Sequence, residues 1–252
     1  MISFIVPAYN EELLIGRALS GIHSAASELS RPYEIIVVDD GSTDRTATLA
    51  EECGARVVNV HHRQIARVRN AGARVAVGDI LVFVDADTVI TASTLRATLD
   101  ALGKGAVGGG ARLRLDGAIP WHGWLLLWLV QAAMRLGRLA AGCYVFCTHA
   151  SFDAVGGFDE RLFATEEIAF SRALARQGRV VILCETVESS GRKLRTFSGW
   201  EILRLLSAVA FQGSDALRRR DGLELWYGQR RIDPEPERTS RGFHGPNQQQ
   251  VD

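Results

Sequence analysis

Short apolar runs alternate with segments of helical periodicity over the first half of the chain, and this alternation constrains the fold more than any other feature. The runs are residues 2–6, 34–38, 56–60 and 80–84. Such alternation is typical of an α/β fold in which crossover helices connect the strands of a mostly parallel sheet. Ile80–Val84 is apolar at every position, which predicts a central strand buried on both faces.

The segments between these runs predict helices with recognisable starts. Asn10, and further along the chain Ser42 or Thr43, carry side-chain oxygens that can cap helix N-termini, and Thr91 is placed to do the same. The helices are expected at 10–22, 43–53, 64–76 and 91–102, and a further strand at 106–115.

One large domain, residues 1–227, is predicted, with two halves that meet near residue 115. Beyond residue 227 the composition turns to Arg, Pro, Gly and Gln, so the tail 228–252 is predicted to be disordered.

The second half, 116–227, begins with an apolar helix that is expected at 121–139. Its uncharged core is shorter than the roughly 20 residues that span a bilayer. Trp121, Trp124 and Trp128 recur at helical spacing, which is typical of a helix packed in the core. The alternative is a helix lying at a membrane surface, where tryptophan favours the headgroup region.

Charge and cysteine content exclude several classes of protein. Lys and Arg total 29, as do Asp and Glu, so the uncompensated positive charge of a nucleic-acid binder is missing. We see no cleavable secretion signal, and therefore expect a cytoplasmic location. The cysteines lack the spacing of a zinc site and lie in apolar segments, which predicts free, buried thiols. They are Cys53, Cys143, Cys147 and Cys184.

Polar clusters follow three of the predicted strands, at residues 7–11, 39–44 and 85–87. Each cluster alone is explained by helix caps or turn residues. Together they indicate a ligand site, because ligands of open parallel sheets bind beyond the carboxyl ends of the strands. Paired carboxylates without Cys or His suit a hard cation such as Mg²⁺ or Mn²⁺. The first loop contains no glycine, which excludes a dinucleotide-binding turn, so the hypothesis is a metal-assisted diphosphate site.

Four ordered segments resemble the family 2 glycosyltransferases, which have the GT-A fold. They are FIVPAYNEE at 4–12, VVDDGSTD at 37–44, RNAG at 69–72 and VFVDAD at 82–87. GGFDE at 156–160, followed by TEE at 165–167, extends the resemblance. It implies a Rossmann-like, mostly parallel sheet flanked by helices, with a nucleotide-sugar half at 1–115 and a mixed, acceptor-side half at 116–227.

The resemblance also implies roles for individual residues. The base, ribose and phosphates of the nucleotide would contact Pro7, Tyr9, Glu11, Asp39, Asp40, Arg69 and Asp85. Mn²⁺ or Mg²⁺ would bind Asp87, together with Asp85, which would lie nearer the ribose. The alternative for Arg69 is a solvated arginine on a helix face.

Family members are inverting, and the acceptor's proton goes to the second acid of a Glu-Asp pair that follows GGFDE. Here the pair is Glu166-Glu167, so Glu167 is the candidate base and Glu166 the fallback. The structural alternative is that Thr165 caps a helix whose dipole favours acids in its first turn. That field lowers a carboxyl pKa, which weakens a base unless burial opposes it.

The predicted activity is transfer of a sugar from a UDP- or GDP-sugar to an acceptor that the sequence does not identify, with a lipid-linked acceptor if 121–139 contacts the inner face of the membrane. The QxxRW signature of processive synthases is absent, which favours single addition. Arg192, Lys193 and Arg195 either close over the diphosphate or form a solvated charge run. His149 either contacts diphosphate or metal, or is structural.

Two alternative functions stay open. One is a catalytically silent nucleotide-sugar-binding or scaffold protein, in which the altered Glu-Glu pair no longer serves as a base. The other is a nucleotidyltransferase-like enzyme, although the glycine- and arginine-rich first loop of that class is missing.

Overall fold

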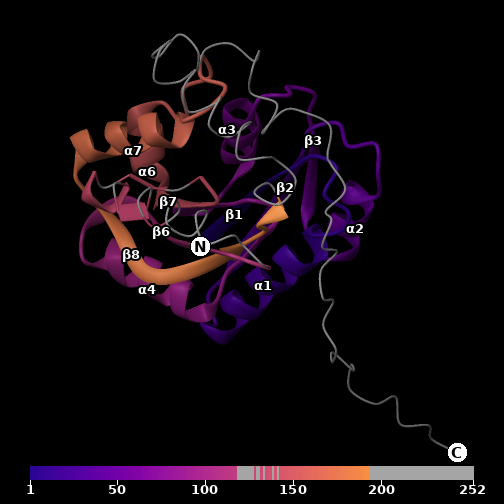
Figure 1. Cartoon of the computed structure of the whole chain (residues 1–252), viewed down its shortest axis with the longest axis horizontal. Coiled ribbons are helices and arrows are strands. Elements are labelled where there is room, and N and C mark those ends of the chain that lie inside the picture. The colour runs from indigo at the N-terminus through magenta and orange to yellow at the C-terminus, as the bar shows by residue number, and fades with distance from the viewer. Residues whose placement is uncertain (118–127, 129–130, 133, 138, 141, 193–252) are drawn as a thin grey trace, which may run out of the picture.

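The computed structural model describes residues 1–117, 128, 131–132, 134–137, 139–140 and 142–192 (Figure 1). The predicted tail, residues 193–227 of the second half, Lys193 and Arg195, and Trp121 and Trp124 all lie outside these residues.

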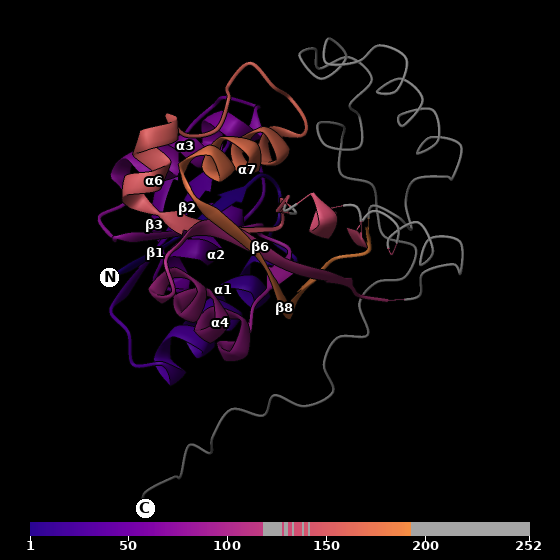
Figure 2. The ribbon, with the colours of Figure 1, turned by 90° about the vertical axis from the view of Figure 1, so that its left-hand side faces the viewer.

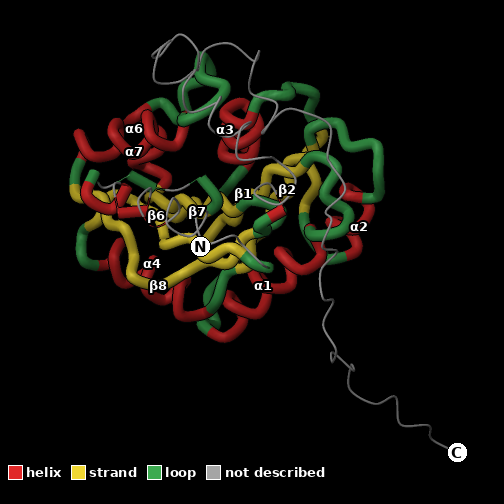
Figure 3. Tube along the Cα trace, in the orientation of Figure 1, coloured by secondary structure: helices red, strands yellow, loops and turns green. Residues whose placement is uncertain are grey.

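One sheet, whose strands are yellow in Figure 3, organises the described part of the chain. Its strand order is β3-β2-β1-β4-β7-β6-β8-β5. Its parallel half consists of β1 (Ile2–Ala8), β2 (Tyr33–Asp39), β3 (Arg56–Asn59) and β4 (Ile80–Val84). The other half consists of β5 (Thr88–Val89), β6 (Ala106–Leu115), β7 (Tyr144–Thr148) and β8 (Arg179–Ser189). β7 is antiparallel to both β4 and β6, whereas β6 and β8 are parallel. The expected α/β class, with a mostly parallel sheet flanked by helices and a mixed portion, is confirmed, but the mixed portion includes β5 and β6, which precede residue 116.

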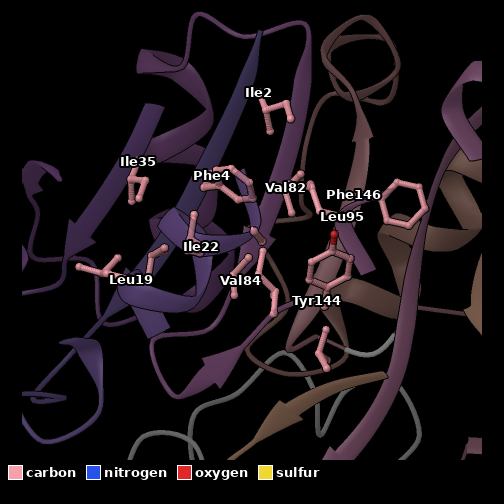
Figure 4. Packing of buried hydrophobic residues seen from close by; sticks show 14 of the residues in the cluster. Ile2, Phe4, Leu19, Ile22, Ile35, Val82, Val84, Leu95, Tyr144 and Phe146 are labelled. Atoms are coloured by element: carbon pink, nitrogen blue, oxygen red, sulfur yellow. The ribbon is translucent and has the colours of Figure 1, made fainter. Parts of the chain in front are cut away.

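Helices cover both faces of this sheet (Figure 2). One face packs against α1 (Ile15–Glu28), α2 (Thr46–Glu52) and α4 (Ala92–Gly103). The other packs against α3 (Ile65–Val75), α6 (His149–Val155) and α7 (Glu166–Gln177). The alternation of side chains along β1 separates the two cores, because Phe4 points into the first and Ile5 into the second. Figure 4 shows the first core, where Phe4 and Val82 lie between the helix residues Ile22 and Leu95.

The glycines of β6 allow this strand to fit between its neighbours. A Cβ at Gly109 would lie 1.9 Å from the Val181 carbonyl oxygen, and one at Gly108 would lie 2.6 Å from the Phe146 oxygen. The predicted strand at 106–115 is confirmed, and these contacts explain why it contains consecutive glycines.

The predicted helix caps at Asn10 and at Ser42 or Thr43 are wrong, because α1 and α2 begin further along the chain. α1 begins only at Ile15, and Asn10 has a left-handed φ of 50° instead of capping it. The Asn10 amide N–H donates to Ser42 Oγ at 2.9 Å, and the Thr43 N–H donates to Asn10 Oδ1 at 2.8 Å. These polar residues therefore join the loops after β1 and β2. The predicted cap at Thr91 is confirmed, since its side chain accepts from the Thr94 N–H at 3.3 Å.

All four cysteines are free, as expected, but they are not all buried. Cys143 and Cys147 are buried, Cys53 is partly buried and Cys184 is exposed. Cys184 lies on β8 at a position that faces away from the cores, which apolar neighbours in the sequence do not reveal.

The predicted helix at 121–139 is described only in part. Trp128 is 63% exposed and Leu136 is 90% exposed, so core packing is wrong for Trp128. Among the described residues, no helix combines the length and apolarity that crossing a bilayer requires.

Candidate functional site

The ends of β1, β2 and β4 meet the start of α7 around one cavity of about 260 Å³. All the predicted site residues except Asp39 line it, namely Pro7, Tyr9, Glu11, Asp40, Arg69, Asp85, Asp87, Glu166 and Glu167. The structure therefore brings together side chains that are far apart in the sequence: Pro7 and Glu167 are separated by 160 positions.

Asp39 and Asp40 have different surroundings. Asp39 is buried, and its Oδ2 accepts from the Ser42 N–H at 3.1 Å, while its Oδ1 is buried without a hydrogen-bond partner in the described part of the chain. Asp40 lines the cavity, and its Oδ1 accepts from the N–H groups of His62 at 2.6 Å and Arg63 at 3.0 Å. Asp40 thus fixes the loop after β3 against the end of β2.

Arg63 is a cavity residue that the sequence analysis missed. Its backbone is left-handed, with φ of 49°, and its side chain lies over the Tyr9 ring, 3.5 Å from guanidinium carbon to ring centroid. It also donates to the Tyr9 hydroxyl at 2.7 Å. Nothing in the local pattern distinguishes Arg63 from the arginines that follow it, because the stacking partner lies 54 positions away.

Glu11 is paired with Arg192. The guanidinium donates to both carboxylate oxygens at 3.0 Å, and the two side chains are only 5% and 13% exposed. A solvated charge run is therefore the wrong interpretation for Arg192. This ion pair connects the segment after β8 to the loop after β1, which is 181 positions away in the sequence.

Arg69 connects the acids on opposite sides of the cavity. This side chain is 3% exposed and donates to Glu166 at 2.7 Å, to Asp85 at 3.1 Å and to the Gly142 carbonyl oxygen at 2.8 Å. Burial alone would lower the pKa of the guanidinium, but the surrounding carboxylates, Asp85 first, raise it above its usual value. A solvated Arg69 is excluded, and its position is fixed by three hydrogen bonds.

Asp85 and Asp87 follow β4 in the loop that leads to β5. Asp85 is 30% exposed and contacts Arg69, whereas Asp87 Oδ1 accepts from Ser189 Oγ at 3.1 Å and Thr88 Oγ1 at 3.3 Å. The described residues contain no cluster of three or more His, Cys, Asp or Glu that could hold a metal. Mg²⁺ commonly uses one or two carboxylates plus substrate phosphates, so this donor set fits a cation that arrives with a diphosphate.

The start of α7 presents two glutamates with different surroundings. Both line the cavity, but Glu166 is buried and paired with Arg69, whereas Glu167 is partly exposed. Burial, followed by the charge of Glu166, raises the pKa of Glu167 to about 8, even though Arg69 acts in the opposite direction. Burial therefore outweighs the influences that lower this pKa and brings it close to neutral pH.

Thr165 lines the cavity, whereas His149 does not. Thr165 precedes α7 with a left-handed φ of 61° and makes no capping bond through its side chain, so the structural alternative lacks the hydrogen bond on which it depends. His149 donates through Nδ1 to the Gly78 carbonyl oxygen at 2.8 Å and does not line the cavity, which supports the structural interpretation.

Comparison with protein families and with curated proteins gives a consistent result. The model of glycosyl transferase family 2 matches residues 3–153. An undecaprenyl-phosphate 4-deoxy-4-formamido-L-arabinose transferase of Pseudomonas aeruginosa LESB58 is 34% identical over 222 residues, covering 83% of this chain and 63% of that protein. The Pseudomonas paraeruginosa PA7 protein of the same name is 33% identical with the same coverage. The chain thus spans about 63% of the length of these curated relatives.

Solved structures share the fold. The mannosyltransferase PcManGT from Pyrobaculum calidifontis, in complex with GDP-Man and Mn²⁺, has a TM-score of 0.63 at 21% identity, covering 82% of this chain and 60% of that one. Staphylococcus aureus TarS 1–349 has a TM-score of 0.60 at 19% identity, with coverages of 91% and 71%. Glucosyl-3-phosphoglycerate synthase from Mycobacterium tuberculosis, with Mn²⁺ and UDP, gives 0.60 at 21% identity, with coverages of 88% and 81%. The predicted GT-A fold is confirmed.

Proposed function

The chain belongs to glycosyl transferase family 2, and from this premise we propose that it transfers a sugar from a nucleoside-diphosphate sugar to an acceptor hydroxyl, with inversion. The observation that carries the proposal is one shared cavity. There, the ends of three strands and the start of α7 bring several carboxylates together with a glutamate of raised pKa. Inversion follows from a single in-line displacement, in which a base on one side opposes a leaving diphosphate on the other.

On the donor side, Tyr9, Glu11 and Asp40 would contact the base and ribose of a UDP- or GDP-sugar, with Pro7 and Asp39 shaping the loops. Support comes from the placement of Tyr9, Glu11 and Asp40 in the cavity, and from neighbours of the same fold that are solved with UDP or GDP-Man. Arg69 would act near the phosphates chiefly by holding Asp85 and Glu166 in position.

Asp87, with Asp85, would hold Mn²⁺ or Mg²⁺. The bound cation supplies charge neutralisation for the departing diphosphate. The carboxylate donor set supports this assignment, as do the Mn²⁺ complexes of two structural neighbours.

On the acceptor side, Glu167 would take the proton of the attacking hydroxyl. Its access to the cavity and its raised pKa support this role, while the ion pair with Arg69 favours an anchoring role for Glu166. A carboxyl with a pKa near the working pH is an efficient proton acceptor, which one with the ordinary value is not.

A second candidate acceptor is a lipid phosphate, favoured by the undecaprenyl-phosphate transferase names of the curated relatives. A phosphate monoester has a second pKa of about 6 and is already mostly ionised at neutral pH, so it needs no base. Glu167→Gln separates the two acceptors: turnover on a hydroxyl acceptor is lost, whereas turnover on a phosphate acceptor is kept.

Contact with the inner face of a membrane is part of the proposal, with a cytoplasmic catalytic domain that adds one sugar at a time. The exposed Trp128 and Leu136 support an interfacial role for 121–139. Trp128→Ser should reduce co-sedimentation with anionic liposomes, and equal sedimentation of the wild type and variant would count against this contact.

Thermal stabilisation tests the donor site. UDP, GDP and dTDP are added with and without Mn²⁺ to the wild type, to Asp87→Asn and to the control Asp100→Asn, which is exposed on α4 outside the cavity. We expect a Mn²⁺-dependent rise in Tm with one nucleotide for the wild type and control, and its loss in Asp87→Asn. No Mn²⁺-dependent rise with any nucleotide would refute the proposal. Donor binding without turnover on any acceptor would indicate the catalytically silent alternative, and release of pyrophosphate from a nucleoside triphosphate would indicate nucleotidyl transfer.

A further inference from the structure

Ser189 lies outside every motif of the family resemblance, yet its side chain contacts a residue of the cavity. Its Oγ donates to Asp87 Oδ1 at 3.1 Å, and the serine is only 8% exposed. The two residues are 102 positions apart, so the fold creates this contact.

The register of β5 and β8 explains the position of the Ser189 hydroxyl. Thr88 and Ser189 are directly opposite each other in this antiparallel pair. Opposed residues of an antiparallel pair project their side chains to the same face. Accordingly, Thr88 Oγ1 donates to the same oxygen, Asp87 Oδ1, at 3.3 Å. A cross-strand pair of hydroxyls therefore holds one oxygen of the aspartate.

The segment that follows Ser189 is itself fixed. The Gly191 N–H donates to Asp116 Oδ1 at 2.7 Å, and Arg192 is paired with both oxygens of Glu11 at 3.0 Å. Ser189 thus lies between the β5 pairing and these contacts, and its backbone has little freedom to move away from Asp87.

Both hydrogen bonds of Asp87 that the structure describes go to Oδ1. We propose that Ser189 is a positioning residue for Asp87: with Thr88 it holds Oδ1 and thereby fixes the orientation of the carboxylate that would bind the cation accompanying the donor diphosphate. The inference rests on the proposed function, because it assumes that Asp87 is the cation-binding acid. Hydrogen bonds that orient a ligating carboxylate commonly change metal affinity by about 10- to 100-fold when removed.

The test is Mn²⁺ affinity, measured from the EPR signal of free Mn²⁺ in the presence of saturating UDP and, separately, GDP. We expect Ser189→Ala to weaken Mn²⁺ binding about tenfold, the lower end of that range, because Thr88 keeps its hydrogen bond. Ser189→Thr, which retains the hydroxyl, should restore the affinity. The matched control is Ser190→Ala, whose hydroxyl accepts from the Arg192 N–H at 3.2 Å instead of contacting Asp87.

A purely structural role would lower the Tm of Ser189→Ala without affecting Mn²⁺ affinity, and that result would overturn the inference. Thr88→Val provides an independent variant that removes the other donor, with a smaller loss of affinity expected from its longer contact. If wild-type protein binds Mn²⁺ and both variants bind it equally well, positioning by the hydroxyls is wrong while the proposed function stands. If the wild type binds no Mn²⁺ with either nucleotide, the cation-binding role of Asp87 fails, and this inference fails with it.

Discussion

The cavity contains two carboxylate pairs, the strand-end pair Asp85 and Asp87 and the helix pair Glu166 and Glu167. Both pairs contact Arg69, but their other surroundings differ. In each pair one acid contacts Arg69, Asp85 at 3.1 Å and Glu166 at 2.7 Å. The second acid of the strand-end pair, Asp87, accepts hydrogen bonds from two hydroxyls. The second acid of the helix pair, Glu167, is instead shifted toward its neutral form by burial and by the charge of Glu166.

We interpret this difference as preparing one functional group, the carboxylate, for the two tasks proposed above. Hydrogen bonds from two hydroxyls fix the orientation of the Asp87 carboxylate, which suits an acid that would hold a cation. Burial favours the neutral form, which brings the pKa close to the range where a proton is readily accepted and released. Substitutions can remove Arg69, displace the helix that carries it, or change one pair alone.

Removing the shared anchor should have the largest effect. Arg69→Met leaves Asp85 and Glu166 without their cation, and breaking a buried ion pair costs about 3–5 kcal/mol of unfolding free energy. Urea denaturation measures this cost. The control Arg74→Met removes an ion pair whose arginine is 62% exposed, for which a cost below about 1 kcal/mol is expected. Equal stabilities of the two variants would show that Arg69 does not join the pairs energetically.

Displacing the helix that carries Arg69 should have an intermediate effect. A Cβ at Gly72 of α3 would lie 2.4 Å from Ile5 Cγ2 and 2.8 Å from Val38 Cγ2. Gly72→Ala should therefore cost about 1–3 kcal/mol through overpacking, measurable as a lower Tm. Gly16→Ala in α1, where nothing lies within 4 Å of the added carbon, should be neutral or slightly stabilising. A neutral Gly72→Ala would mean that α3 can move away from the sheet without cost.

A change in the helix pair alone should affect stability in a way that depends on pH, with the smallest effect at acid pH. The pKa of Glu167 is raised to about 8 in the folded protein, so the folded state binds more protons than the unfolded state between about pH 4.5 and pH 8. Its contribution to stability is therefore lost as the pH rises through this window. Glu167→Gln should raise the Tm at pH 8.5 and leave it nearly unchanged at pH 4.5. An increase of the same size at both pH values would contradict burial of an ionisable group as the cause.

The sequence predicted the features that depend on local pattern. Strands at the four apolar runs and a strand at 106–115 follow from hydrophobicity, and the cavity follows from the rule that parallel strands end at one edge. Local pattern failed where polar residues serve distant partners. Asn10 and Ser42 look like helix caps, but each binds the other's loop, which no window of sequence shows.

Contacts across the sheet were equally inaccessible to sequence reasoning. The Arg192–Glu11 pair and the Ser189–Asp87 bond depend on where β8 ends and on its short pairing with β5. β5 is only two residues long and carries no periodic signal. The order in which the strands of the second half pair decides these contacts, and that order follows from tertiary packing.

Donor binding and sugar transfer, measured in the same two variants, decide whether the strand-end pair binds the donor and the helix pair accepts the proton. Asp87→Asn should weaken Mn²⁺-dependent nucleotide binding at least tenfold. Glu167→Gln should bind the donor as the wild type does and transfer its sugar to a hydroxyl acceptor about 10²- to 10⁴-fold more slowly. Transfer by Glu167→Gln to that hydroxyl acceptor at the wild-type rate would contradict the account.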